Sequence, residues 1–120
     1  MNRHIVSQMV LGWPLTAEAI PAGRDWLICV TGGCAPHVGS VSTGRWTEAG
    51  AEVETICLPS HRDDVISELF ARELAASLRT TVCVTCGIHY DGIDRAGIEA
   101  VVSQANALVK ELAERCAALA

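Results

Sequence analysis

Charged residues are scarce in this 120-residue sequence, at 19%, and its nine Lys and Arg residues stand singly along the chain. The formal net charge is -5, and no continuous basic stripe is present that could neutralise a row of phosphates. We therefore expect no nucleic acid among the partners of this protein.

Long hydrophobic runs are also missing. No run is longer than that from Trp26 to Val30, which is far short of the roughly 20 apolar residues that a membrane-spanning helix needs. The apolar stretch near the start is broken at Ser7, Gln8 and Pro14, so it lacks the hydrophobic region of a secretory signal. We expect a cytoplasmic protein without a membrane partner.

Apolar residues, in contrast, are abundant, at 50% of the sequence, which excludes intrinsic disorder. The length is typical of one domain, and we expect residues 1–120 to form a single domain. Apolar side chains in this excess either fill a dense core or cover part of the surface, and a large exposed apolar patch usually marks an association site. The composition therefore predicts a homo-oligomer.

The residue patterns place most strands early and the helices late. Strands are expected at 5–11, 25–31, 38–46, 52–58 and 80–85, where β-branched residues alternate or cluster between turn signals. Short turns between the early strands predict antiparallel pairing. Helical spacing begins after Ser60 and again after Asp94, which can serve as an N-cap. The order β-β-β-β-α-β-α predicts an α+β fold, a mostly antiparallel sheet with two helices packed on one face.

Three histidines stand where an expected strand gives way to a loop or helix: His37, His61 and His89. Glycine or proline brackets each of them, so the imidazoles are held at element ends, where scaffolds display reactive groups. An imidazole can bind a metal, relay protons or donate to a phosphate or carbonyl. The alternative is that these rings only brace their loops.

Each of the last two histidine segments also carries carboxylates. Asp63 and Asp64 follow His61 and equally suit the positive end of a helix dipole, whereas Asp91 follows His89 without such an explanation. Arg62 can donate two parallel hydrogen bonds to a phosphate or carboxylate. The resulting hypothesis is one pocket lined by His37, His61, Arg62, His89 and Asp91.

The six cysteines are interpreted as thiols, because the chain is too rich in aliphatic residues for a disulfide scaffold. Cys83 and Cys86 lie on an expected strand, where their spacing sends the two side chains to opposite faces. Two C-x-x-H units offer another arrangement, a tetrahedral zinc site. Its four ligands would be Cys34, His37, Cys86 and His89.

Three segments carry a family resemblance: GGCAPHVG (32–39), SHRDD (60–64) and CGIHYDGI (86–93), in this order and with a long helix after the third. In these motifs the sequence resembles the prenylated flavin chaperone-like (LpdD-like) proteins, which include the small D subunit of gallate and vanillate-type decarboxylase systems. The resemblance extends over residues 25–112. Cys34 and Cys86 are not part of the family pattern.

The resemblance implies an accessory protein of UbiD-type decarboxylases of aromatic acids, which binds or delivers prenylated FMN and is not itself the catalyst. The implied cofactor contacts are Gly33, Pro36, His37, Gly39, His61, Arg62, Asp63, His89 and Asp91. Trp26, Trp46 or Tyr90 would provide an aromatic wall for the flavin ring. Two other hypotheses remain: a small zinc-dependent or acid-base enzyme that uses the three histidines, and a structural subunit whose histidines only brace loops.

Overall fold

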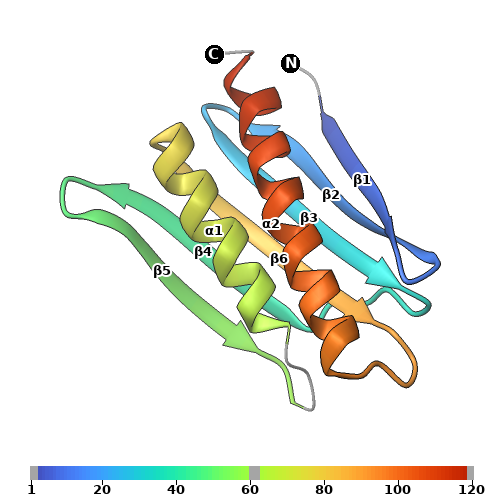
Figure 1. Cartoon of the computed structure of the whole chain (residues 1–120). Coiled ribbons are helices and arrows are strands. Elements are labelled where there is room, and N and C mark those ends of the chain that lie inside the picture. The colour runs from blue at the N-terminus through green and yellow to red at the C-terminus, as the bar shows by residue number, and fades with distance from the viewer. Residues whose placement is uncertain (1–2, 60–62, 119–120) are drawn as a thin grey trace.

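The computed structural model describes residues 3–59 and 63–118. In chain order its elements are β1 (His4–Val10), β2 (Trp13–Ala22), β3 (Asp25–Gly33), β4 (Ser40–Thr47), β5 (Gly50–Cys57), α1 (Asp64–Leu78), β6 (Thr81–His89) and α2 (Arg95–Ala117). The two helices lie side by side on one face of a six-stranded, mostly antiparallel sheet (Figure 1). The α+β class expected from the sequence is therefore confirmed, with the order β-β-β-β-β-α-β-α.

One strand, β2, was not predicted. Pro14 and Pro21 argue against a strand here, because proline cannot donate to a strand ladder. Both stand near the ends of β2, as its second and last-but-one residues, and the interior between them pairs with β1 and β3. Leu15, Ala17 and Ala19 alternate as fully buried positions, which is the period-2 pattern of a strand with one covered face.

The strand order is β1-β2-β3-β6-β4-β5. β6 therefore lies between β3 and β4, and the expected antiparallel pairing of these two early strands is wrong. β6 pairs parallel with β3 and antiparallel with β4. β6, which comes late in the sequence, thus lies in the centre of the sheet. The 34–39 segment passes the end of β6 to connect β3 to β4.

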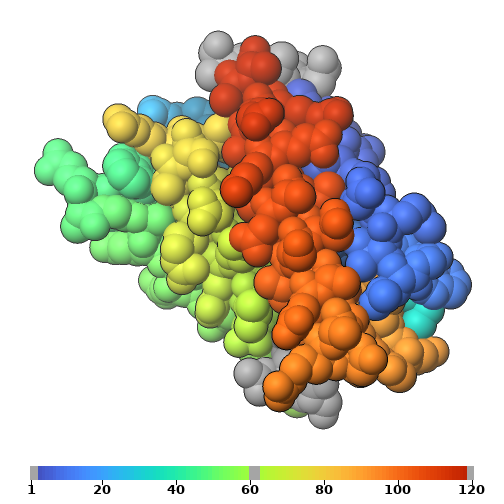
Figure 2. Space-filling view, viewed as in Figure 1, coloured from blue at the N-terminus to red at the C-terminus, as the bar shows by residue number. Residues whose placement is uncertain are grey.

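The core fills the space between the sheet and the helices. One row of paired residues crosses the sheet from strand to strand on the face that the helices cover. It includes Val6, Ala17, Val30 and Cys86, all at most 2% exposed. The helices contribute Phe70, Leu74, Leu108 and Leu112, which are equally buried or nearly so. Figure 2 shows α1 and α2 covering this face, with the β4–β5 hairpin extending beyond α1. None of the described helices is long and apolar enough to cross a membrane.

The two helices point the same way, which fixes the position of the site. Figure 1 shows the N-terminal ends of α1 and α2 at the end of the sheet where β3 and β6 finish. Because β3 and β6 are parallel neighbours, the loops that follow them also meet there. Ligands of α/β sheets bind beyond the carboxyl ends of such strands, close to helix N-termini that carry a partial positive charge.

Candidate functional site

A cavity of about 500 Å³ opens at this end of the sheet; we call it the His37 cavity. The start of α1, the end of β6 and the first turns of α2 enclose it. Its polar lining residues are His37, Asp63 and His89. Its apolar lining residues are Val65, Ile66, Ile88, Ile93, Ile98, Val101 and Val102, and Tyr90 completes the wall. A few polar groups in an apolar lining of this volume are typical of a small-molecule site.

His37 and Asp63 form the central polar contact of the cavity. Nδ1 of His37 lies 3.0 Å from the Ala35 carbonyl oxygen, an acceptor, so Nδ1 carries a proton. Nε2 lies 3.1 Å from Oδ2 of Asp63, and an ionised carboxylate is also only an acceptor. The ring is therefore held between the Ala35 carbonyl and the Asp63 carboxylate, both of which are hydrogen-bond acceptors.

Asp63 occupies the N-cap position of α1 without capping the helix through its side chain. Its Oδ1 instead accepts a hydrogen bond of 3.0 Å from the backbone N–H of Ile88 in β6, and its residue is only 7% exposed. The carboxylate thus connects three segments: the 34–39 loop, the start of α1 and the end of β6. The sequence suggested helix-dipole stabilisation for Asp63, and the structure adds these contacts with His37 and Ile88.

Glycines allow the 34–39 loop to lie against β6. A Cβ on Gly87 would lie 1.6 Å from the carbonyl oxygen of His37, and one on Gly39 would lie 1.9 Å from Oδ2 of Asp63. The loop is then held by a 2.8 Å hydrogen bond from the Gly39 N–H to the Cys86 carbonyl. A side chain at Gly87 would clash with the His37 backbone, and one at Gly39 would clash with the Asp63 carboxylate.

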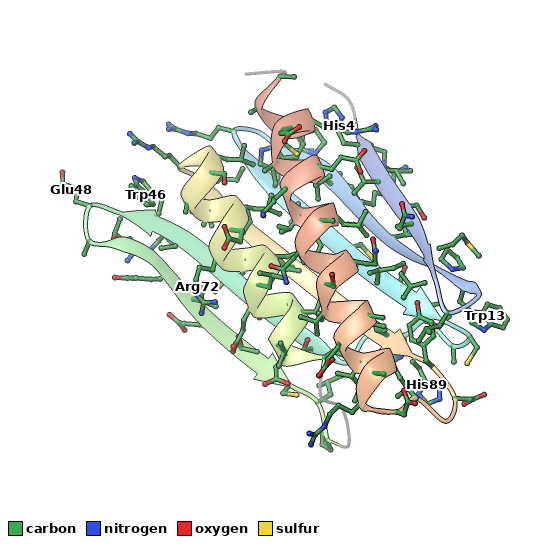
Figure 3. All side chains as sticks on the ribbon, viewed as in Figure 1. His4, Trp13, Trp46, Glu48, Arg72 and His89 are labelled. Carbon is green, nitrogen blue, oxygen red and sulfur yellow. The ribbon has the colours of Figure 1, made fainter. Side chains whose placement is uncertain are left out.

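A second cavity, of about 580 Å³, lies beside the first; we call it the Cys34 cavity. Leu11, Trp13, Cys34, Asp91 and the first residues of α2 line it, and Tyr90 and Ile93 line both cavities. Figure 3 shows Trp13 and His89 at this same end of the molecule.

His89 and Asp91 form an ion-pair contact between the two cavities. Nε2 of His89 lies 2.7 Å from Oδ1 of Asp91, and the Cys34 thiol also donates to the Asp91 side chain. The hydrogen bond from His89 has the largest effect and that from Cys34 the next, and together they hold the pKa of Asp91 below its usual value. Burial raises the pKa of the neighbouring Tyr90 phenol.

The structure thus brings several predicted site residues together. His37, Asp63 and His89 line the His37 cavity, Asp91 lines the adjacent one, and Gly33 and Gly39 position the loop between them. Pro36 is exposed on that loop. His61 and Arg62 lie outside the described residues.

The four residues of the alternative zinc set are not gathered in one place. Cys34 lies beside His89, whereas the His37 ring turns to Asp63. Cys86 is fully buried in the core, and burial raises the pKa of its thiol well above the usual range, which disfavours the thiolate that zinc needs. Cys83 is only half-buried, as expected from the opposite faces of a strand.

The apolar wall of the His37 cavity is the part that sequence reasoning missed. The helical spacing expected after Asp94 covers Val101 and Val102 without marking them as lining residues, and Ile88 stands only inside the third motif. Of the three aromatic candidates for a flavin wall, Tyr90 lines the cavity. Trp46 instead lies under Arg79, whose guanidinium carbon is 5.5 Å from the centre of the Trp46 ring. Figure 3 shows Trp46 far from His89. Trp26 contacts the ring of His4, at 6.0 Å between centres.

Three comparisons with known proteins bear on this site. The family model of the prenylated flavin chaperone LpdD-like domain matches residues 10–117, a range that contains all described lining residues of both cavities. Protein LpdD of Lactiplantibacillus plantarum strain WCFS1 is 34% identical over 106 residues, which cover 84% of this chain and 76% of that protein. A chain from the crystal structure of a chaperone complex for yeast 20S proteasome assembly has a TM-score of 0.58 at 15% identity, and covers 97% of this chain and 98% of its own length. At that identity the likeness concerns the fold alone.

Proposed function

The chain belongs to the prenylated flavin chaperone LpdD-like family, and from this membership we propose that it binds prenylated FMN and delivers it to a UbiD-type aromatic acid decarboxylase. The protein would act as a non-catalytic accessory subunit in the cytoplasm, as a single domain that associates with copies of itself. Prenylated FMN supplies the decarboxylation chemistry once it is bound to the decarboxylase. The residues of this chain would only hold, orient and shield it.

The observation that carries the proposal is the His37 cavity itself. Its apolar walls, on β6 and α2, suit one face of an isoalloxazine ring, and its histidines suit the ring carbonyls or the phosphate. The N-terminal ends of both helices point to this end of the sheet, where their partial positive charge favours an anion.

The carboxylate of Asp63 would repel a phosphate if it stood alone. Its contacts with His37 and with the N–H of Ile88 give each of its oxygens a hydrogen-bond partner before a ligand enters, which lessens this repulsion. The proposed contacts are Gly33, Pro36, His37, Gly39, His61, Arg62, Asp63, His89 and Asp91. Arg62 would add the cation that the phosphate requires.

The direct test is a fluorescence titration of the purified chain with FMN and with prenylated FMN. His37→Ala and His89→Ala are each expected to weaken binding by about 1 to 3 kcal/mol, or about 5-fold to 150-fold in Kd, the usual cost of an unmet polar partner. His4→Ala is the matched control, because Figure 3 places His4 at the opposite end of the molecule. Equal flavin affinity in all three variants would reject the His37 cavity as the site.

The partner is tested by transfer. The chain loaded with prenylated FMN is mixed with a UbiD-type apo-decarboxylase, and cofactor is followed into the larger protein by absorbance after gel filtration. We expect faster or more complete loading than with free cofactor. Identical loading with and without the chain would contradict a delivery role.

A further inference from the structure

The donor atoms of Cys34, His89 and Asp91 form a compact cluster beside the Cys34 cavity. The Sγ atom, an imidazole nitrogen and a carboxylate oxygen all lie within 4.8 Å of one another. They come from the ends of two parallel strands, so they converge only in the folded chain.

The backbone fixes the two strand ends against each other. The N–H of Cys34 donates a 2.8 Å hydrogen bond to the carbonyl of His89, and the Cys34 thiol lies 3.5 Å from the same oxygen. Gly33 precedes Cys34 with a φ of 85°, and a Cβ there would lie 1.8 Å from that carbonyl. The thiol is therefore held beside His89 by a close strand contact that only glycine permits.

From these observations we propose that this chain binds one Zn²⁺ ion through Cys34 Sγ, His89 Nε2 and a carboxylate oxygen of Asp91, with a fourth position open to the Cys34 cavity. Thiolate and imidazole donors select zinc over magnesium or calcium, and three protein ligands with one open position are typical of an accessible zinc site. Binding releases the thiol proton to water, and the neutral ring coordinates through Nε2 with its proton on Nδ1.

The geometry requires only small movements. Zinc–ligand bonds of about 2.0 to 2.3 Å at tetrahedral angles place neighbouring donors about 3.4 to 3.6 Å apart. The His89–Asp91 contact, now 2.7 Å, has to open by less than about 1 Å. Both side chains are free to do so, with exposures of 51% and 86%.

The charge around the cluster also favours a cation. Asp91 and Asp94 both line the Cys34 cavity, and its described lining contains no Lys or Arg. A thiolate and a carboxylate together neutralise the divalent ion. His89 and Asp91 are also among the proposed flavin contacts, so the metal site is tested in the absence of flavin.

Titration of the untagged, reduced chain with Co²⁺ and then Zn²⁺, without flavin, tests the site. We expect one ion per chain, a thiolate-to-cobalt charge-transfer band that Zn²⁺ abolishes, and retention of one zinc after gel filtration. Loss of an outer-shell partner alone typically costs 10-fold to 100-fold in metal affinity. Cys34→Ser, His89→Ala and Asp91→Asn are therefore each expected to weaken Zn²⁺ binding by about 100-fold or more.

Cys83→Ser is the matched control, because its thiol is half-buried on the same strand, six residues before His89. Circular dichroism confirms that each variant is folded before the titration. Absence of the charge-transfer band in the parent chain, or a band that Cys34→Ser leaves intact, would overturn the proposal.

Discussion

Asp63 illustrates how the tertiary structure reassigns a single side chain. Its sequence position before α1 predicts a helix cap, yet its carboxylate contacts His37 and the N–H of Ile88 instead. A carboxylate that is 7% exposed needs such partners, because a buried charge without them costs several kcal/mol. The positions of His37 and of the loop around it depend on this contact.

The first prediction at the residue scale concerns Gly87. Gly87→Ala places a Cβ on the carbonyl of His37, so the 34–39 loop has to move. We expect a loss of about 1 to 3 kcal/mol in the free energy of unfolding, as for other overpacked sites, measured by urea denaturation. Cys83→Ala, on the same strand, is the control. Unchanged stability and unchanged flavin affinity in Gly87→Ala would contradict the close approach of loop and strand.

The second concerns Asp91. Hydrogen bonds from His89, first, and from Cys34 lower its pKa below 3.8, so the folded state binds this proton less readily than the unfolded state does. The contribution of Asp91 to stability is therefore present above pH 3.8 and is lost as the pH falls through its folded pKa. In an NMR titration of the side-chain carboxyl, we expect His89→Ala to raise the midpoint toward 3.8 and Cys34→Ala to raise it less. A midpoint at or above 3.8 in the parent chain would count against the contact.

At the scale of elements, hydroxyl groups join α1 to β4 within the core. Ser40 donates to Oγ of Ser67 at 2.9 Å, Ser42 lies 2.8 Å from the same atom, and Ser67 donates to the Asp64 carbonyl. Ser42 also contacts Thr55 of β5 at 2.8 Å. These three serines are fully buried, so the hydrogen bonds fix how the first turn of α1 lies on the sheet.

Ser67→Ala therefore removes the acceptor of the buried Ser40 hydroxyl, whereas Ser42 keeps its contact with Thr55. We expect a loss of about 1 to 3 kcal/mol in the free energy of unfolding, the cost of leaving such a group unsatisfied. The matched control is Ser77→Ala, an exposed serine on the same helix, for which a change within about 0.5 kcal/mol is expected. Equal stability of the two variants would show that the serine contacts contribute nothing.

At the scale of the whole molecule, one face of the sheet is left uncovered by the described helices. Ile5, Leu27 and Ile56 stand on this open face, at 55%, 48% and 67% exposure, with half-buried Cys29 and Val41 beside them. Glu18, Arg45 and Glu52 stand on the same face, so it is mixed, and its exposed apolar side chains are the part that suits an association surface. The homo-oligomer stays a prediction, and this face is where we expect its contact.

Light scattering coupled to gel filtration tests that location. We expect a mass above the 12.7 kDa of one chain at micromolar concentration, and a shift to 12.7 kDa in Leu27→Glu, because the added charge would be buried where an apolar side chain made contact. Ala76 is exposed on α1, on the helix side of the sheet, so Ala76→Glu should leave the mass unchanged. A parent chain that is only monomeric at these concentrations would reject the prediction.

The sequence by itself determined the features that depend on near neighbours. Period-2 and helical patterns gave the α+β class, and Asp94 was confirmed as the N-cap of α2, where its side chain accepts from the Gly97 N–H at 2.8 Å. The motifs around His37 and His89 indicated the family because they are contiguous. β2 was the strand that its two prolines concealed. Both prolines stand near the ends of the strand, where they are tolerated.

Only the tertiary structure decided which distant segments meet. The insertion of β6 between β3 and β4 places Cys34 beside His89, and the approach of α1 to β6 brings Asp63 to His37. Cys34 and Cys86 both head a C-x-x-H unit, yet one lies at a cavity and the other in the core. The physical reason is that strand order and helix placement follow from burying one common core, a property of all the apolar side chains together, which no local motif contains.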